Sequence, residues 1–159
     1  MNTKLLMTLS AIILALIGIS LIFFPKEISK ERRVAALPST IQRLIDLGID
    51  VSVETGFGDS LYIFDKDFED SGAEIIKDRS EGLAVSDIVC RINKPPEDEI
   101  HILKEGGIHI SFLDPFNEKN LVDAFVSSRS TAISMELVPR ITRAQKMDAL
   151  SSQANLGGY

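Results

Sequence analysis

The stretch PSTIQRLIDLGIDVSVE, residues 38–54, decides the expected fold class. Ser39 can cap a helix, and apolar residues follow it at helical spacing: Ile41, Leu44, Ile45 and Leu47. Gly48 is a typical residue for ending such a helix. Asp50–Glu54 then alternates polar and apolar residues with the period of a β-strand. A helix, a glycine and a strand in direct succession indicate one step of an α/β fold.

The same alternation continues on both sides of this stretch. Further strands are predicted at Ile19–Phe24, Ala73–Ile76, Asp87–Ile92, Ile108–Leu113 and Thr131–Leu137. Further helices are predicted at Asp65–Ser71, Ser80–Ala84, Glu97–Lys104, Asn117–Ser127 and Ala144–Leu156. Strands that alternate with short helices form a mostly parallel sheet between two helical layers, a Rossmann-like α/β/α sandwich. Ligands of such sheets bind at the carboxyl ends of the strands, so we expect function in the loops there.

Composition limits the possible functions. The chain has 159 residues, enough for one domain, and 17 basic against 23 acidic residues give a net charge of −6. This balance argues against nonspecific nucleic-acid binding, which depends on clustered cations. One cysteine excludes an intramolecular disulfide, and two histidines leave little for a metal site, so no metal is expected.

The first 24 residues differ from the rest of the chain. Leu5–Phe24 is apolar except for Thr8, Ser10 and Ser20, and its length suits a membrane-spanning helix. It fits a secretory signal poorly, because no small-residue cleavage site follows it. It fits a membrane anchor better, with the cations after residue 24 placing the body in the cytoplasm. A buried strand is the third interpretation, and Ile19–Phe24 can serve as the first strand of a body that comprises residues 25–159.

Familiar catalytic motifs are missing. Gly56-Phe57-Gly58 follows a predicted strand, but Leu61 stands where a dinucleotide fingerprint needs its third glycine, so a turn is expected. No Walker sequence or Gly-x-Ser-x-Gly elbow occurs. Cys90 is expected to be a buried, inert thiol, and neither His101 nor His109 has metal-site spacing.

Two basic positions lie just after predicted strands. Arg33 belongs to a charge cluster with Glu31 and Arg32, and Lys94 precedes Pro95-Pro96. Either residue can contact an anionic substrate, or can be an ordinary solvated charge. The sequence leaves both possibilities open.

The stretch after Pro139 is the most informative for function. If it is helical, Gln145, Asp148 and Ser151 lie near one face. An aspartate and a serine can hold ribose hydroxyls, and Arg140 can meet a phosphate or an amide carbonyl. An ordinary exposed helix face would show the same spacing.

The chain resembles the alanine dehydrogenase/transhydrogenase family. The resemblance begins with Pro25-Lys26-Glu27-Ile28, Glu31–Ala35 and Pro38-Ser39-Thr40, and continues through Val53–Gly58 and Gly72–Ile75. Phe112–Pro115 and the run from Pro139 to Tyr159 resemble one branch, the NAD-binding domain of proton-translocating transhydrogenase alpha subunits.

This resemblance implies hydride transfer between NAD(H) and NADP(H), coupled to proton movement across a membrane. By motif match, Arg140, Asp148 and Ser151 hold NAD(H), and Gln145 is the catalytic residue that helps to bring the two nicotinamides together. The implied partners are a second NAD subdomain, membrane subunits and a subunit that binds NADP(H). A homodimer at the cytoplasmic face of the membrane is also expected.

Two departures from the family pattern bear on these expectations. The family's glycine-rich NAD loop belongs to a second subdomain that follows the stretch present here, so we expect weak or no NAD binding by this chain alone. Members of the family also begin with a short strand directly before Pro-Lys-Glu, whereas roughly eighteen extra apolar residues precede that strand here.

Two alternative functions stay open. An alanine dehydrogenase uses a histidine in the loop that Asp114-Pro115 occupies here, which argues against that activity. The second alternative is a non-catalytic, membrane-tethered remnant that dimerises or acts as a scaffold.

Overall fold

A computed structural model describes residues 21–28 and 30–149 of the chain. Six strands form one sheet in the order β3-β2-β1-β4-β5-β6, and every neighbouring pair is parallel. The strands are β1 (Leu21–Phe24), β2 (Asp50–Glu54), β3 (Glu74–Ile76), β4 (Ile88–Cys90), β5 (Ile108–Ser111) and β6 (Thr131–Ser134). The predicted parallel α/β fold is confirmed.

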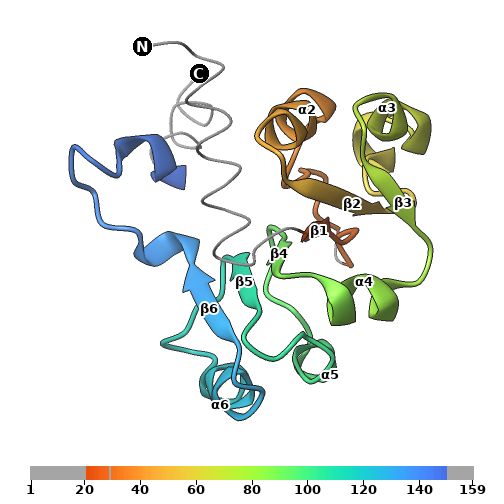
Figure 1. Cartoon of the computed structure of the whole chain (residues 1–159). Helices are drawn as coiled ribbons and strands as arrows, with labels where there is room; N and C mark the ends of the chain where they lie inside the picture. The colour runs from red at the N-terminus through yellow and green to blue at the C-terminus, as the bar shows by residue number, and fades with distance from the viewer. Residues whose placement is uncertain (1–20, 29, 150–159) are drawn as a thin grey trace.

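The helices cover the sheet from two sides (Figure 1). They are α2 (Pro38–Asp46), α3 (Asp65–Asp70), α4 (Arg79–Val85), α5 (Glu97–Ile100) and α6 (Lys119–Ser127). Ile41 of α2 and Phe68 of α3 share one core with Phe24 of β1. On the opposite face, Leu83 of α4 packs with Phe23 and Val89. This alternation of side chains along β1 and β4 produces the three layers.

The apolar run at the start of the chain ends as the central strand. β1 pairs with β2 on one side and with β4 on the other, so it is covered on both faces. A strand in this position needs apolar residues at every position, as Leu21–Phe24 provides. Ile19 and Ser20 of the predicted strand, and the predicted membrane anchor before them, lie outside the described residues. Among the described residues, no helix has the length and apolarity to cross a membrane.

Three predicted elements depart from the structure by three residues or more at one end. The predicted strand Thr131–Leu137 ends at Ser134, and Met135–Leu137 forms a 3₁₀ turn. The predicted helix Glu97–Lys104 ends at Ile100, where backbone turns close toward Gly107. The predicted helix from Ala144 does not form over residues 144–148, where Gln145–Met147 makes a 3₁₀ turn and Asp148 has φ −74° and ψ 89°.

His109 is a buried titratable group on the face of the sheet that α6 covers. Its Nε2 lies 3.1 Å from Ser111 Oγ, and its ring centroid lies 5.4 Å from that of Phe125. Its Nδ1 has no hydrogen-bond partner among the described residues. Burial, with a smaller contribution from the Arg91 charge, lowers the pKa of His109 to about 3. The ring is therefore neutral in the folded protein at ordinary pH.

Replacing Gly82 by alanine is expected to destabilise the protein. Gly82 faces the buried ring of Phe23, and a Cβ atom there would lie 2.6 Å from the ring. We expect a loss of about 1–3 kcal/mol in the free energy of unfolding, as is typical of overpacking. Urea denaturation measures it, and Glu81→Ala on the exposed side of the same helix is the control. An unchanged unfolding midpoint for Gly82→Ala would show that β1 and α4 are not packed as described.

Acidification is expected to destabilise the fold through His109. The folded-state pKa lies below the ordinary value of 6.5, so the unfolded chain takes up a proton first. Stability is then lost as the pH falls below about 6.5, by about 1.4 kcal/mol per pH unit down to the folded pKa. In His109→Gln this part of the slope should disappear, whereas His101→Gln, at an exposed position, should retain it. Equal slopes in both variants would contradict the assignment.

Candidate functional site

The carboxyl ends of β1 and β4 lie side by side, where the direction of strand succession reverses. Sheets of this kind bind their ligands at such a point. A hollow of about 580 Å³ opens there. Its lining combines apolar side chains with Arg33 and Arg91: Phe24, Val34, Ala35, Leu37, Leu61, Cys90, Ile92, Ile110, Phe112, Met135 and Ala149 complete it.

A network of ion pairs connects α4, α5 and the strand ends at the carboxyl edge of the sheet. Arg79 donates to Glu54 over 2.7 Å and to Glu99 over 2.9 Å, and Arg91 donates to the other Glu99 oxygen over 2.5 Å. The Arg91 side chain is 1% exposed. Buried charges of this kind are stable only when they are paired and hydrogen-bonded.

Carboxylates also fix the loops that follow the strands. Glu27 accepts hydrogen bonds from the backbone N–H groups of Ile92 and Asn93, and so connects the loop after β1 to that after β4. Glu54 accepts from the Lys26 N–H, and Asp65 accepts from the Gly56 N–H. The loops after β1, β2 and β4 are thereby attached to other parts of the chain.

Arg33 and Lys94, the two basic candidates after the strands, pair with different carboxylates. Arg33 lines the hollow at the β1–β4 junction and donates two side-chain hydrogen bonds to Glu31. These bonds lower the pKa of Glu31 to about 2 and raise that of Arg33. Lys94 is paired with Glu118 and is not part of the lining of this hollow. The structure does not bring Arg33 and Lys94 to one place.

The loop after β6 brings the other predicted site residues together. Arg140, Gln145 and Asp148 line a hollow of about 320 Å³, together with Ile141 and Thr142. Backbone hydrogen bonds from Ala144 to Ile141 and from Met147 to Ala144 fold the loop into consecutive tight turns. Ala144 is its buried anchor, whereas Arg140 and Gln145 are exposed.

A 3₁₀ turn produces the grouping that the sequence attributed to an α-helix. Residues at i and i+3 are superposed along a 3₁₀ turn, so Gln145 and Asp148 project to one side. The predicted helix does not form over residues 144–148, but the common side is retained. Ser151, the fourth predicted site residue, lies outside the described residues.

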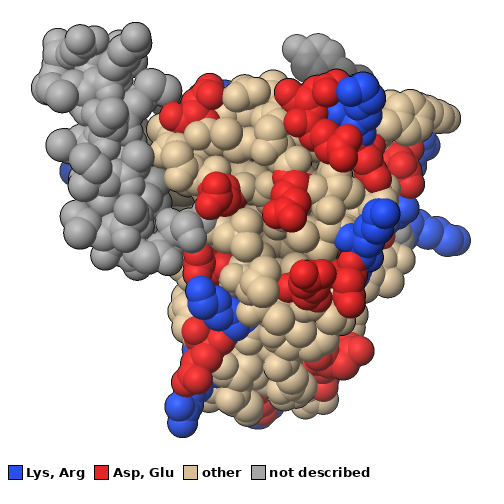
Figure 2. Space-filling model, turned by 45° about the vertical axis from the view of Figure 1, so that its right-hand side comes forward, with Lys and Arg blue, Asp and Glu red and all other residues tan. Residues whose placement is uncertain are grey.

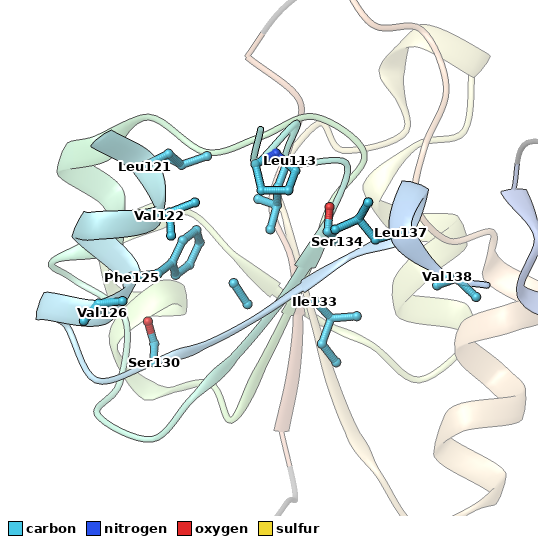
Figure 3. A pocket seen from close by; sticks show the side chains of 12 residues that line it. Leu113, Leu121, Val122, Phe125, Val126, Ser130, Ile133, Ser134, Leu137 and Val138 are labelled. Carbon is cyan, nitrogen blue, oxygen red and sulfur yellow. The ribbon is translucent and has the colours of Figure 1, made fainter. Parts of the chain in front are cut away.

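A third hollow is apolar and lies between α6 and β6 (Figure 3). It measures about 550 Å³, and the described residues that line it include no charged side chain: Leu113, Pro115, Leu121, Val122, Phe125, Val126, Ser130, Ala132, Ile133, Ser134, Leu137 and Val138. Such a lining suits apolar surface rather than a phosphate or a sugar.

Charge and metal-site geometry add little to these hollows. Figure 2 shows acidic and basic side chains interspersed over one face of the described residues, with no continuous basic area there. No group of three His, Cys, Asp or Glu residues in residues 21–28 and 30–149 could hold a metal ion. Burial raises the pKa of the Cys90 thiol to about 12, in agreement with the predicted inert cysteine.

The network of Arg79, Arg91 and Glu99 was not predicted from the sequence. Arg91 was the available signal, because it follows the apolar residues Ile88, Val89 and Cys90 within the predicted strand of residues 87–92. A charged residue inside a buried strand requires a partner. The identity of that partner, eight residues along the chain in α5, follows only from the fold.

Comparison with known proteins identifies the family of the chain. Residues 23–157 match the family described as alanine dehydrogenase/PNT, N-terminal domain. The chain is 39% identical over 140 residues to the NAD(P) transhydrogenase subunit alpha of Haemophilus influenzae, covering 87% of this chain and 27% of that protein. It is 38% identical over 144 residues to an NAD(P) transhydrogenase subunit alpha protein of Rhodospirillum rubrum, covering 87% of this chain and 38% of that protein.

A solved structure shows the same likeness. The transhydrogenase from Sinorhizobium meliloti superposes with a TM-score of 0.82 at 37% identity, covering 88% of this chain and 42% of that chain. The chain thus spans less than half the length of the relatives it matches.

Replacing Glu99 by glutamine is expected to destabilise the carboxyl edge. The substitution leaves the buried Arg91 without its carboxylate, at a cost of about 3–5 kcal/mol in the free energy of unfolding. Glu105→Gln is the matched control, because Glu105 pairs with Arg129 at the surface, and it should cost less than about 1 kcal/mol. Chemical denaturation distinguishes them, and equal losses would contradict a buried network.

Proposed function

Because the chain belongs to the alanine dehydrogenase/PNT N-terminal domain family, we propose that it is the NAD(H)-positioning part of an NAD(P) transhydrogenase alpha subunit. The observation that carries the proposal is the hollow that Arg140, Gln145 and Asp148 line together. These are the residues that the transhydrogenase branch of the family uses at its nicotinamide. The complete enzyme is a proton-translocating oxidoreductase, and this chain supplies one component of it.

The donor set of the hollow fits one end of a dinucleotide. The Asp148 carboxylate accepts hydrogen bonds from ribose hydroxyls, and Ser151 follows it three residues later in the sequence. The Arg140 guanidinium donates to a phosphate or to the nicotinamide amide carbonyl. The Gln145 amide is the catalytic residue, and it orients the nicotinamide toward the NADP(H) side.

NAD(H) supplies the hydride chemistry when it is bound, and the residues of this chain supply position. A hollow of about 320 Å³ is at the lower end of the usual range for ligand sites. The rest of the NAD site therefore belongs to a second subdomain. NADP(H) is bound by a partner subunit, and further subunits carry the proton path, which places the chain at the cytoplasmic face of the membrane. We also propose a homodimer.

The geometry favours this function over that of an amino-acid dehydrogenase. The loop after β5 offers Asp114 and Pro115 where that branch needs a histidine. His109 is buried within β5 with a pKa of about 3, so it cannot serve as a base there. Lys94 is held by Glu118, apart from Arg33. The third candidate function, a non-catalytic scaffold, differs from these two enzyme functions in one measurable respect. A scaffold makes no contribution to NADH binding.

NADH titration tests the proposal. The chain contains no tryptophan, so the fluorescence of added NADH is measured directly. We expect weak or no saturation with the chain alone, and saturable binding after the region of the Rhodospirillum rubrum alpha subunit that the chain does not match is added. Asp148→Asn should weaken binding in the mixture about tenfold, the loss of one charge-assisted hydrogen bond.

The control is Asp123→Asn, which removes an exposed carboxylate of α6 and should leave the affinity unchanged. Tight binding by the chain alone would contradict the half-site. Binding in the mixture that is insensitive to Asp148→Asn would contradict the role of the loop. Alanine-dependent NADH formation would favour the dehydrogenase alternative.

A further inference from the structure

The outer side of β6 is a strand edge that can pair with another strand. β6 is the last strand of the sheet, and among the described strands it pairs with β5 alone. The Thr131 N–H bonds to Gly107 on the β5 side, and backbone groups alternate between the two sides of a strand, so those of Ala132 and Ser134 point outward. Natural proteins usually protect such an edge with charged side chains or proline. Thr131–Ser134 contains neither.

The apolar hollow between α6 and β6 lies directly beside this edge (Figure 3). Its lining includes Val122 and Val126 of α6, which are 39% and 73% exposed, and Ile133 of β6, which is 39% exposed. Leu137, which follows β6, is half exposed as well. Apolar side chains that are exposed together mark a surface for another protein. We call the outer side of β6 and these four side chains the β6 edge surface.

We propose that the β6 edge surface binds a second copy of the chain, with the two β6 strands antiparallel across a twofold axis. The inference rests on the proposed function, because it gives the proposed homodimer an interface. Ala132 of each copy lies opposite Ser134 of the other, and Ile133 lies on the axis opposite its own copy. With Ala132 on the axis instead, pairing would need the Ser130 N–H, which already bonds to the Phe125 carbonyl.

The charges around β6 favour this antiparallel arrangement. Each chain has a net charge of −6, but no charged side chain lies within the paired strands. Arg129 precedes β6 and Glu136 follows it, so Arg129 of one copy comes to the same end as Glu136 of the other. Arg129 donates through one nitrogen to Glu105 and is 79% exposed, which leaves N–H groups for a second carboxylate.

The twofold axis also explains the apolar hollow. An axis perpendicular to the sheet keeps the two α6 helices on the same side of the joined sheet. The hollows of the two copies then face each other across the paired strands. Their linings form one shared apolar layer, in which Val126 and Ile133 lose exposed area.

Self-crosslinking of the whole 159-residue chain tests the register. In a Cys90→Ser background, which removes the only native thiol, Ile133→Cys places two thiols across the axis on Cα atoms about 4.5 Å apart, within disulfide reach. We expect copper–phenanthroline to convert most of this variant to a covalent dimer at micromolar concentration. Thr131→Cys is the matched control, exposed on the same strand. Its two copies lie four positions apart, about 13 Å along the strands, and should not crosslink.

Sedimentation equilibrium of the same chain measures the association. We expect twice the mass of one chain, and Ile133→Lys should weaken the dimer at least about tenfold, because like charges then face each other across the axis. Ala132→Pro, which removes an outward N–H, should weaken it in the same way. Val85→Lys is the control, because Val85 is half exposed on α4, which lies against β1, β2 and β3. Urea denaturation establishes that each variant is folded.

A chain that stays monomeric at every concentration would overturn the proposal. A dimer that resists Ile133→Lys, or that crosslinks equally through Thr131→Cys, would overturn it too. A third contrary result is a monomer that binds the added region of the Rhodospirillum rubrum alpha subunit and loses this binding in Ile133→Lys. NADH titration of the mixture tests the proposed function separately, because it measures the loop of Arg140–Asp148, whereas sedimentation measures the β6 edge surface.

Discussion

The loops at the carboxyl edge of the sheet depend on carboxylates. These side chains accept hydrogen bonds from the backbone N–H groups of the loops and fix the loop conformations. Parallel strands end there together, and each following loop begins with N–H groups that the sheet no longer pairs. Glu27 satisfies two of them after β4, and Glu136 accepts from Leu113 and Asp114 after β5. Burial alone would raise the pKa of Glu136, but the nearby Ser134 hydroxyl and the hydrogen bonds from backbone N–H groups lower it. The acidic composition therefore has a structural use: several carboxylates hold the loops on which a ligand site depends.

Sequence periodicity could predict the fold because it depends on local patterns. The alternation in Asp50–Glu54 and the glycine at position 48 determine where a strand and a helix lie, and the parallel order follows from their succession. The hydrogen bonds that connect one loop to another could not be predicted from sequence periodicity. Glu27 and Ile92 lie 65 residues apart, and no sequence pattern joins them. The Arg91–Glu99 pair was visible only as an arginine in an apolar strand, without its partner.

At the candidate site, the residues could be predicted but their backbone could not. The resemblance to a known family identified Arg140, Gln145 and Asp148, and the structure places all three at one hollow. The stretch is polar and lacks a regular apolar stripe, and only Ala144 is buried in it. A helix there would have had little packing to stabilise it, so tight turns form instead. The spacing of three residues keeps Gln145 and Asp148 on one side in either conformation, which is why the predicted helix and the observed turn group the same two residues.

The contrast between the two polar regions indicates how the protein can work. The carboxyl edge is rigid, because buried ion pairs connect α4, α5 and the strand ends. The loop of Arg140–Asp148 has one buried anchor and exposed functional side chains, so part of the binding energy of any ligand is spent in ordering it. A second protein surface that packs against the loop removes that cost before the ligand arrives. Under the proposed function, the affinity of this site for NAD(H) therefore depends on assembly, because the partner that orders the loop also favours binding of the cofactor.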